Sequence, residues 1–398
     1  MINVKEVTKD IWWIGGSDRR LAKFENLFPL PDGVSYNSYL VIDEKTALFD
    51  TADESIADQF LENLKGTLGE RKLDFLVVLH MEPDHCSQIA NVAALYPDLT
   101  IVSNSKTFAF MDQFFPDIKN IKRQEVKEGD SFSTGKHSFS FVNAPMVHWP
   151  EVMFAYDSES KALFSADAFG TFGAVDSGIF ADEYDFEHKY LSEARRYYAN
   201  IVGKYGMQVQ AVLGKAKNLD IQMLLPLHGP IWRKDLSWFI DKYQKWSSYE
   251  AEDDETVVVY GSLYGHTKSA AEAFARTLRE KQGKQVSVLD VSKTDVSDLI
   301  GEVWRCKRVV IFCPTYNGGL YPPIESFIND MIALGVQKKV FALAQNGTWG
   351  PVTGKLMADK LAVLKNVEIV EKVLTIKSAL HEGDVAQLDE FVDAIIAK

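Results

Sequence analysis

Four residues with metal-binding side chains lie within six positions of the sequence. They are His80, Glu82, Asp84 and His85, and they directly follow an apolar run of strand length at residues 73–79. Imidazole and carboxylate groups at this density are typical of a metal site. Neither a regular helix nor a strand presents all four in one direction. We therefore expect an irregular loop at a strand end, where the side chains converge.

Three more candidate ligands follow predicted strands further along the chain. They are His148, Asp167 and His228. Each alone is more typical of an ordinary structural residue, just as the first group alone could be a polar loop. Together the seven are enough for two metal ions with one carboxylate bridging them. We assign none of His137, His188, His266 and His381 to the metal, and we expect His137 and His381 at the surface.

A second kind of site is predicted near residue 260. A strand at residues 256–260 is followed by a short loop and then by a helical stretch at 268–279. Small and hydroxyl residues between a strand and a helix N-terminus form a cradle for an anion such as phosphate. The loop consists of Gly261 and the residues that we expect to bind the ligand: Ser262, Leu263, Tyr264, Gly265, His266 and Thr267.

Two further glycine-containing loops follow predicted strands at residues 309–312 and 341–343. The ligand sites of open α/β sheets lie at the carboxyl ends of strands. The glycines let the backbone approach a flat ring, on which Tyr316 or Trp349 could stack. The first loop contains Pro314, Thr315, Tyr316, Asn317, Gly318 and Gly319. The second contains Asn346, Gly347, Thr348, Trp349 and Gly350.

The elements that must position these residues change in pattern along the chain. Strands at residues 39–42 and 46–49 flank a short turn, and further strands at 139–142, 152–156 and 162–164 favour antiparallel pairing. Apolar residues every fourth position from Ile56 to Leu68 predict an amphipathic helix. After residue 255, strands and helices alternate, which predicts a doubly wound parallel sheet. We therefore expect an α/β protein.

Composition limits the classes of function. The chain has 398 residues, 43 Lys and Arg against 56 Asp and Glu, a net charge of −13 and three cysteines. These values disfavour a membrane span, a secreted disulfide scaffold, a basic nucleic-acid binder and any domain with four cysteine ligands. We expect a cytoplasmic protein. The acidic residues at 250–255 predict an exposed connector, although a surface loop within one domain is the alternative.

The first motif, H-x-E-x-D-H followed by a lone His, a lone Asp and a final His, resembles the metallo-β-lactamase fold in its flavodiiron version. Hydrolytic members of that fold usually carry H-x-H-x-D-H and bind zinc. Here Glu82 occupies the middle position. A carboxylate is a harder ligand than imidazole, which favours iron. The resemblance implies an αββα sandwich at residues 1–250, followed by a flavodoxin-like domain at 254–398.

Carried over residue by residue, the resemblance implies one iron on His80, Glu82 and His148. It implies a second iron on Asp84, His85 and His228, with Asp167 bridging the two. Asp50 matches a position whose side chain usually supports a metal ligand without binding the metal itself. The alternative is an ordinary turn residue. Tyr197 matches a tyrosine that the family places near the diiron pocket, where a catalytic role and core packing are both open.

The three later loops resemble those of flavodoxin, which implies FMN. Tyr264 departs from the phosphate-loop pattern S/T-x-S/T-G-x-T, so a tyrosine hydroxyl or a backbone N–H would have to replace one hydroxyl contact. The whole chain thus resembles flavodiiron proteins. That resemblance implies a diiron and FMN oxidoreductase that reduces O2 to water, nitric oxide to nitrous oxide, or both. It also implies an external donor, either rubredoxin or a reduced deazaflavin, and no membrane or nucleic-acid partner.

The family resemblance further implies a head-to-tail homodimer, or a dimer of dimers, in which each flavin lies beside the partner's metals. Three other functions compete with the reductase. The first is a zinc hydrolase with a flavodoxin-like regulatory domain, the second a non-catalytic electron carrier, and the third a metal-dependent nuclease. Glu82 opposes both the hydrolase and the nuclease, the complete flavin loops also oppose the hydrolase, and the acidic charge opposes the nuclease.

Overall fold

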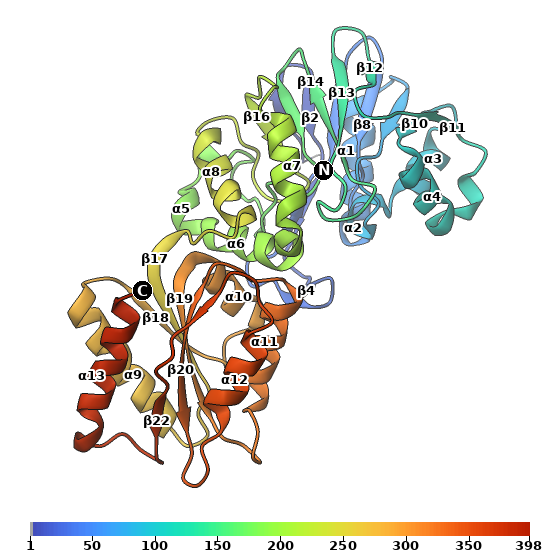
Figure 1. Ribbon diagram of the computed structural model, residues 1–398. Coiled ribbons are helices and arrows are strands. Elements are labelled where there is room, and N and C mark those ends of the chain that lie inside the picture. The colour runs from blue at the N-terminus through green and yellow to red at the C-terminus, as the bar shows by residue number, and fades with distance from the viewer. Residues whose placement is uncertain (1–2) are drawn as a thin grey trace. The chain divides into compact units, whose positions relative to one another are not determined.

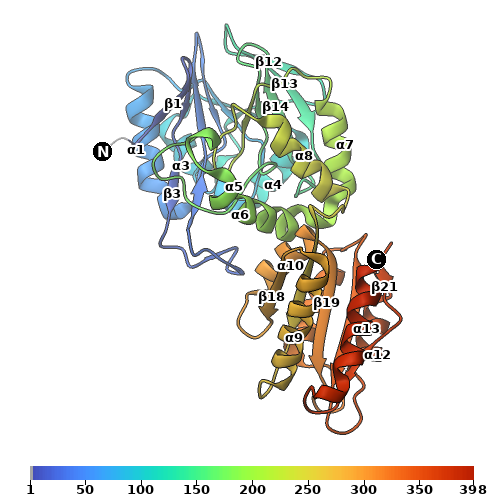
Figure 2. The same cartoon turned by 90° about the vertical axis from the view of Figure 1, so that its left-hand side faces the viewer.

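The computed structural model describes residues 3–398, which form two compact units. The N-terminal unit contains residues 3–198 and 207–244. The C-terminal unit contains residues 199–206 and 245–398. The chain therefore crosses between the units more than once, since a short segment around residue 200 belongs with the C-terminal unit. Figures 1 and 2 show the elements of each unit from two sides.

Two sheets form the centre of the N-terminal unit. The first runs in the order β1 (Lys5–Thr8), β2 (Ile11–Trp13), β7 (Tyr39–Ile42), β8 (Thr46–Phe49), β9 (Phe75–Val77), β10 (Thr100–Ser103) and β11 (Lys122–Glu125). The second runs in the order β12 (Ser131–Ser133), β13 (Ser138–Asn143), β14 (Met153–Asp157), β15 (Ala162–Phe164) and β16 (Met223–Leu225). Short pairs join β3 (Gly16–Asp18) to β6 (Val34–Tyr36), and β4 (Lys23–Phe24) to β5 (Phe28–Pro29).

The two sheets pack face to face through aromatic side chains. Phe49 of β8 stacks on Phe164 of β15, with ring centroids 4.2 Å apart, and also packs against Phe139 of β13 at 4.8 Å. All three rings are fully buried. Burial of apolar area on this scale stabilises the sandwich by about 25 cal/mol per Å². The expected strands at residues 39–42, 46–49 and 162–164 coincide with β7, β8 and β15.

Helices cover the outer faces of these sheets, which completes an αββα arrangement (Figure 1). Counting those elsewhere in the unit, its helices are α1 (Ala57–Leu68), α2 (Pro83–Cys86), α3 (Ile89–Leu95), α4 (Ser105–Phe114), α5 (Phe186–Lys189), α6 (Leu191–Tyr197), α7 (Gly206–Ala216) and α8 (Leu236–Ser247). The amphipathic pattern of residues 56–68 correctly predicted α1, whose Phe60, Leu64 and Leu68 are buried. Among residues 3–398, no helix is both long and apolar enough to cross a membrane.

The C-terminal unit is a parallel sheet with helices on both faces. Its strands run in the order β18 (Val286–Asp290), β17 (Asp253–Tyr260), β19 (Cys306–Pro314), β20 (Val340–Asn346) and β21 (Glu368–Ile369), and β22 (Leu374–Ile376) also pairs with β20. Its helices are α9 (His266–Gln282), α10 (Val296–Arg305), α11 (Pro322–Ala333), α12 (Thr353–Leu361) and α13 (Val385–Ile396). α9 and α13 cover one face and α10, α11 and α12 the other (Figure 1).

Two local expectations were wrong. Residues 253–255 of the acidic run belong to β17 rather than to a connector, and Arg308 lies 2.7 Å from Asp254. Arginine partners thus hold acidic residues in a strand that charge repulsion alone would disfavour. His137, expected at the surface, is buried, and its Nδ1 lies 2.7 Å from Asp157. A buried carboxylate partner is what makes burial of that imidazole possible.

Candidate metal centre and flavin cleft

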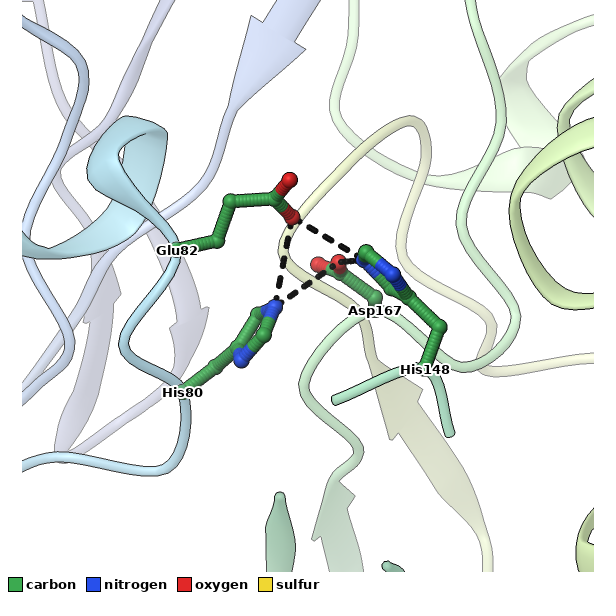
Figure 3. Close-up of side chains that lie close together, drawn as sticks. All are labelled: His80, Glu82, His148 and Asp167. Atoms are coloured by element: carbon green, nitrogen blue, oxygen red, sulfur yellow. Dashed lines mark hydrogen bonds and ion pairs between the residues drawn. The ribbon is translucent and has the colours of Figure 1, made fainter. Parts of the chain in front are cut away.

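Four side chains from three segments converge in the N-terminal unit (Figure 3): His80, Glu82, His148 and Asp167. Nε2 of His148 lies 2.9 Å from Oε2 of Glu82 and 3.1 Å from Oδ2 of Asp167. Nε2 of His80 lies 3.3 Å and 3.4 Å from the same two oxygens. All four side chains are buried. Donor atoms gathered this closely could hold one metal ion.

Asp84, His85 and His228 form a second group of donors. Oδ2 of Asp84 lies 3.3 Å from Nε2 of His85 and 3.2 Å from Nε2 of His228. Asp167 joins this group to the first, because its Oδ1 lies 3.0 Å from Nε2 of His85 while its Oδ2 faces His148. The structure thus brings all seven predicted donors together, with the carboxylate of Asp167 between the two groups.

Local backbone structure explains how neighbours in sequence reach different groups. Residues 80–82 follow β9 without regular structure, with Glu82 extended, whereas Asp84 and His85 lie on the single turn of α2. The expectation of an irregular loop throughout was therefore wrong for these two residues. Pro83 occupies the first helical position, where its missing N–H costs nothing. The change from extended to helical backbone turns the side chains of the run towards two different points.

Glu151 and Ser35 fix the orientation of two imidazoles. Nδ1 of His80 lies 2.8 Å from Oε1 of Glu151, and Nδ1 of His228 lies 2.8 Å from the carbonyl oxygen of Ser35. A carbonyl can only accept, so Nδ1 of His228 carries a hydrogen, and Nε2 is the atom that has the lone pair in the neutral imidazole. The carboxylate of Glu151 favours the same tautomer at His80. Both Nε2 atoms therefore face the carboxylates as metal ligands do.

Asp50 supports the site from the backbone. Its Oδ1 accepts hydrogen bonds from the backbone N–H groups of Leu79, at 2.7 Å, and His80, at 3.2 Å. These bonds also explain why β9 ends before the apolar run does, since a side chain and not a neighbouring strand binds the last N–H groups. Burial raises the pKa of Asp50 to about 7, against the lowering effect of these bonds. Asp50 therefore holds the backbone at His80 and does not contact the imidazole of His80.

The buried carboxylates of the cluster require positive charge beside them. Burial alone would lower the pKa of His148, but its hydrogen bonds to Asp167 and Glu82 raise that pKa to about 10. Asp84 and Asp167 raise the pKa of His85 to about 9 in the same way, against burial. Buried carboxylates of this kind are stable only beside positive charge. Protons on the imidazoles or metal ions between the donors can both supply it.

Unsatisfied polar atoms favour the metal. Both carboxylate oxygens of Asp84, Oδ1 of Asp167 and the hydroxyl of Tyr197 are buried without a hydrogen-bond partner in the described part of the chain. Orphaned oxygens are costly unless a ligand satisfies them. The ring of Tyr197 lies 5.5 Å from that of His228. Gly170 permits this packing, since a Cβ there would lie 3.2 Å from the Tyr197 ring. The donor set therefore fits two metal ions.

Sequence reasoning missed the hairpin of β4 and β5. Phe24 in this hairpin is buried with its ring edge-on to His228, at 5.3 Å between centroids. Desolvation, and then the nearby carboxyl group of Glu82, raise the pKa of the next residue, Glu25, to about 8. Glu151 was also missed. Neither acidic residue belongs to a motif, so only the folded chain identifies them.

The C-terminal unit contains a cavity of about 670 Å³ at the carboxyl ends of β17, β19 and β20. Every residue that we expected to bind the flavin lines it except Gly265 and Gly319, and Ser378 lines it in addition. Gly265 adopts a positive φ of 97° directly before α9, a conformation that glycine adopts without strain. Trp349 and Tyr264 are 85% and 93% exposed at this cleft. The volume and position suit a flavin.

Comparisons with known proteins match each half of the chain to a known family. Residues 34–229 match the family model "ODP family beta lactamase", and residues 258–387 match the model "Flavodoxin". A protein of Moorella thermoacetica named nitric oxide reductase is 31% identical over 98% of both chains. A Vibrio vulnificus protein named anaerobic nitric oxide reductase flavorubredoxin is 30% identical over 88% of this chain and 72% of its own length.

The chain belongs to the flavodiiron proteins. Among solved structures, rubredoxin oxygen:oxidoreductase of Desulfovibrio gigas is 25% identical and superimposes with a TM-score of 0.92 over 99% of this chain and 98% of its own. The flavodiiron protein of Giardia intestinalis has the same TM-score at 24% identity, with 100% and 98% coverage. Membership of the flavodiiron proteins confirms the predicted fold, the oxidoreductase class and the two predicted cofactors, a diiron centre and FMN.

Proposed function

We propose that this chain reduces O2 to water, nitric oxide to nitrous oxide, or both, with electrons that an external donor passes through FMN. One observation carries the proposal: two groups of buried donors share Asp167 in a chain that also forms a flavin cleft. A hydrolase needs no flavin, and an electron carrier needs no paired metal site. The relatives named above as nitric oxide reductases and oxygen oxidoreductase support this reaction class.

The proposed ligands follow from the donor geometry. His80, Glu82 and His148 would hold one iron, and Asp84, His85 and His228 the other, with the two oxygens of Asp167 divided between them. Glu82 makes this a carboxylate-rich set, which suits iron better than an all-imidazole set does. The seventeen residues of the three loops would bind FMN, with the phosphate at the start of α9.

When bound, the iron pair polarises and reduces the diatomic molecule, and FMN stores the electrons. Tyr197 would act as a hydrogen-bond donor to that molecule. Burial and the charge of Asp167 hold the pKa of Tyr197 well above its usual range, so the hydroxyl keeps its proton. That hydroxyl has no partner in the described residues. It is therefore ready to donate to an oxygen held beside Asp167, and it cannot serve as a base.

We also propose an oligomeric state, domain limits, a cellular location and an electron donor. A head-to-tail homodimer, or a dimer of dimers, would cover the exposed aromatic residues Tyr264 and Trp349 at the flavin cleft. It would also bring each flavin to the partner's metals. We propose domain limits of 1–250 and 254–398, a location in the cytoplasm, and rubredoxin or a reduced deazaflavin as the donor.

The test is to purify the chain without air, measure its iron, zinc and FMN, and mix the reduced protein with each gas in a stopped-flow instrument. We expect two irons and one FMN for each chain, in line with the paired donor groups, and rapid reoxidation by at least one gas. A matched chain with Asp220→Asn, an exposed carboxylate that pairs with Lys161 and belongs to neither donor group, controls for purification effects. Two zincs with no gas consumption would reject the proposal in favour of a hydrolase.

A further inference from the structure

Asn346, at the end of β20, contacts each of the other loops around the flavin cleft. Its carbonyl oxygen accepts from the backbone N–H of Thr315 at 2.7 Å. Its side-chain Nδ2 donates to Oγ1 of Thr267 and to the carbonyl oxygen of Ser378, both at 3.1 Å. Its Oδ1 accepts from the backbone N–H of Ser378, also at 3.1 Å. The side chain is buried, so these bonds hold its amide in one orientation.

The bond to Thr267 determines what that hydroxyl can do. An amide Nδ2 can only donate, so Oγ1 of Thr267 is the acceptor in this contact. The single hydrogen of the hydroxyl then remains for another partner. Thr267 is the second residue of α9 and lines the cleft. At this position the helix N-terminus attracts an anion, so an available hydroxyl donor here suits a phosphate.

The charges around the cleft agree with an anionic ligand. The described residues that line it include His266 and no Asp or Glu. Lys268 lies one residue beyond Thr267, with its Nζ 3.7 Å from Glu272 on the next turn of α9. Ser262 accepts from the backbone N–H groups of Gly265 and Lys268 and so shapes the loop itself. Thr267, in contrast, is held from outside its own loop, by Asn346.

We propose that Asn346 is a positioning residue that aims the Thr267 hydroxyl at the phosphate of FMN, and that the cleft thereby selects FMN over riboflavin. The proposal rests on the FMN site proposed above and adds a residue that acts on it through Thr267. Asn346 does not itself touch the phosphate in this assignment. A hydrogen bond to a charged group contributes more than one between neutral groups, so a misdirected hydroxyl has a measurable cost.

A purely structural role for Asn346 makes a different prediction. Asn346 and Gly347 also join β20 to the segment after β22, through Ser378 and through the bond from Gly347 N–H to the Ile376 carbonyl oxygen at 3.1 Å. If Asn346 only held these loops together, its loss would weaken the binding of any flavin. Riboflavin has the same ring and ribityl chain as FMN but no phosphate. The ratio of the two affinities therefore separates the two roles.

The experiment measures flavin affinity by fluorescence quenching in the full-length chain after its flavin has been removed. We expect Asn346→Ala and Thr267→Val each to weaken FMN binding about tenfold, and riboflavin binding less than about twofold. The double variant should bind FMN no more weakly than Thr267→Val alone, since both changes remove one contact. Asn329→Ala, at an exposed position of α11, is the matched control and should change neither affinity.

Two results would overturn the proposal. One is an equal loss of FMN and riboflavin affinity in Asn346→Ala, and the other is additive losses in the double variant. If thermal unfolding shows that Asn346→Ala does not fold, Asn346→Ser, which retains a small polar side chain, takes its place with the same criteria. Failure of the proposed FMN site would look different, because the unmodified chain would then bind neither flavin, and failure of the proposed gas reduction would leave the flavin affinities of all these variants as expected.

Discussion

The metal cluster and the flavin cleft are built from different parts of the chain. Seven side chains make the first site, and all of them are buried in the N-terminal unit. Loop backbone and small side chains make much of the second, and its aromatic residues Tyr264 and Trp349 are exposed. A single side-chain change should therefore abolish the first site but only weaken the second.

The difference also determines what the fold has to supply. The metal cluster draws on segments from residue 80 to residue 228, so both sheets of the sandwich must form before the donors meet. The flavin cleft requires only the aligned carboxyl ends of neighbouring parallel strands. We therefore expect metal binding to be linked to the folding of the N-terminal unit, and flavin binding to be a more local property.

The strongest test of this contrast is Asp167→Asn. This change keeps the shape of the side chain but removes a charge that faces both donor groups. We expect loss of metal from both positions and a fall in gas consumption of more than about a hundredfold. Metal analysis and stopped-flow mixing measure these effects. FMN content should not change, and a variant that keeps both metals would show that Asp167 does not bridge them.

The next largest effect should come from Glu151→Gln. The amide keeps the size of Glu151 but weakens its contact with Nδ1 of His80. Loss of such a supporting partner typically lowers metal affinity by about 10- to 100-fold. Competition with a chelator measures the affinity, and Glu159→Gln, at a more exposed position nearby in sequence, is the control. Equal chelator resistance in the two variants would contradict a supporting role for Glu151.

Replacement of His137 tests how a buried histidine outside the metal cluster depends on its carboxylate neighbours. Burial alone would lower the pKa of His137, but Asp157, with Asp43 and Asp10, raises it above 6.5. A raised pKa adds stability that is complete below about pH 6.5 and is lost as pH rises through the folded value. His137→Asn should therefore lower the free energy of unfolding by about 1–2 kcal/mol near pH 5.5 and by less near pH 9.

Denaturant unfolding at the two pH values measures this difference. Both proteins contain the same metal ligands, so protonation of the metal cluster is common to them. The metal content of His137→Asn should not change, because His137 belongs to neither donor group of the described residues. A destabilisation that is larger at the higher pH would show that a neutral His137 makes the stronger contact with Asp157.

The smallest effect is expected at Tyr264. Replacement by Ser restores the hydroxyl pattern of a flavodoxin phosphate loop, from which Tyr264 departs. Because this side chain is 93% exposed, the change should alter FMN affinity by less than about threefold. Fluorescence titration measures the affinity, with Thr267→Val as a variant of larger expected effect. A tenfold loss would mean that Tyr264 folds over the bound flavin, and a tenfold gain would mean that the restored hydroxyl contacts the phosphate.

The contrast between the sites also explains what the sequence could predict. The metal donors were predictable because chemistry demands particular side chains, and His80, Glu82 and Asp84 lie in one short run. The loops of the flavin cleft were predictable as a pattern of strand, glycine and helix. The strands that carry them follow from apolar runs, so the fold could also be predicted. Assignments that depend on contacts between distant segments could not be.

Glu151, Ser378 and His137 illustrate that limit. Nothing in the sequence distinguishes Glu151 from the other acidic residues. The fold places its Oε1 2.8 Å from Nδ1 of His80. Ser378 joins the flavin cleft only because β22 pairs with β20, a contact between distant parts of the chain. His137 lies among polar neighbours in sequence, and only the partner Asp157 on β14 explains its burial. Each of these roles comes from tertiary contacts and not from residue type.

The most direct test of the central claim is an anaerobic reductive titration of the purified chain, beside Asp167→Asn. If a metal pair and a flavin both take part in redox chemistry, the chain takes up more electrons than its FMN can hold, and a diatomic gas removes them all. Asp167→Asn should take up only the flavin's share. Equal uptake by the two proteins would mean that the metal cluster takes no part in redox chemistry and would contradict the account.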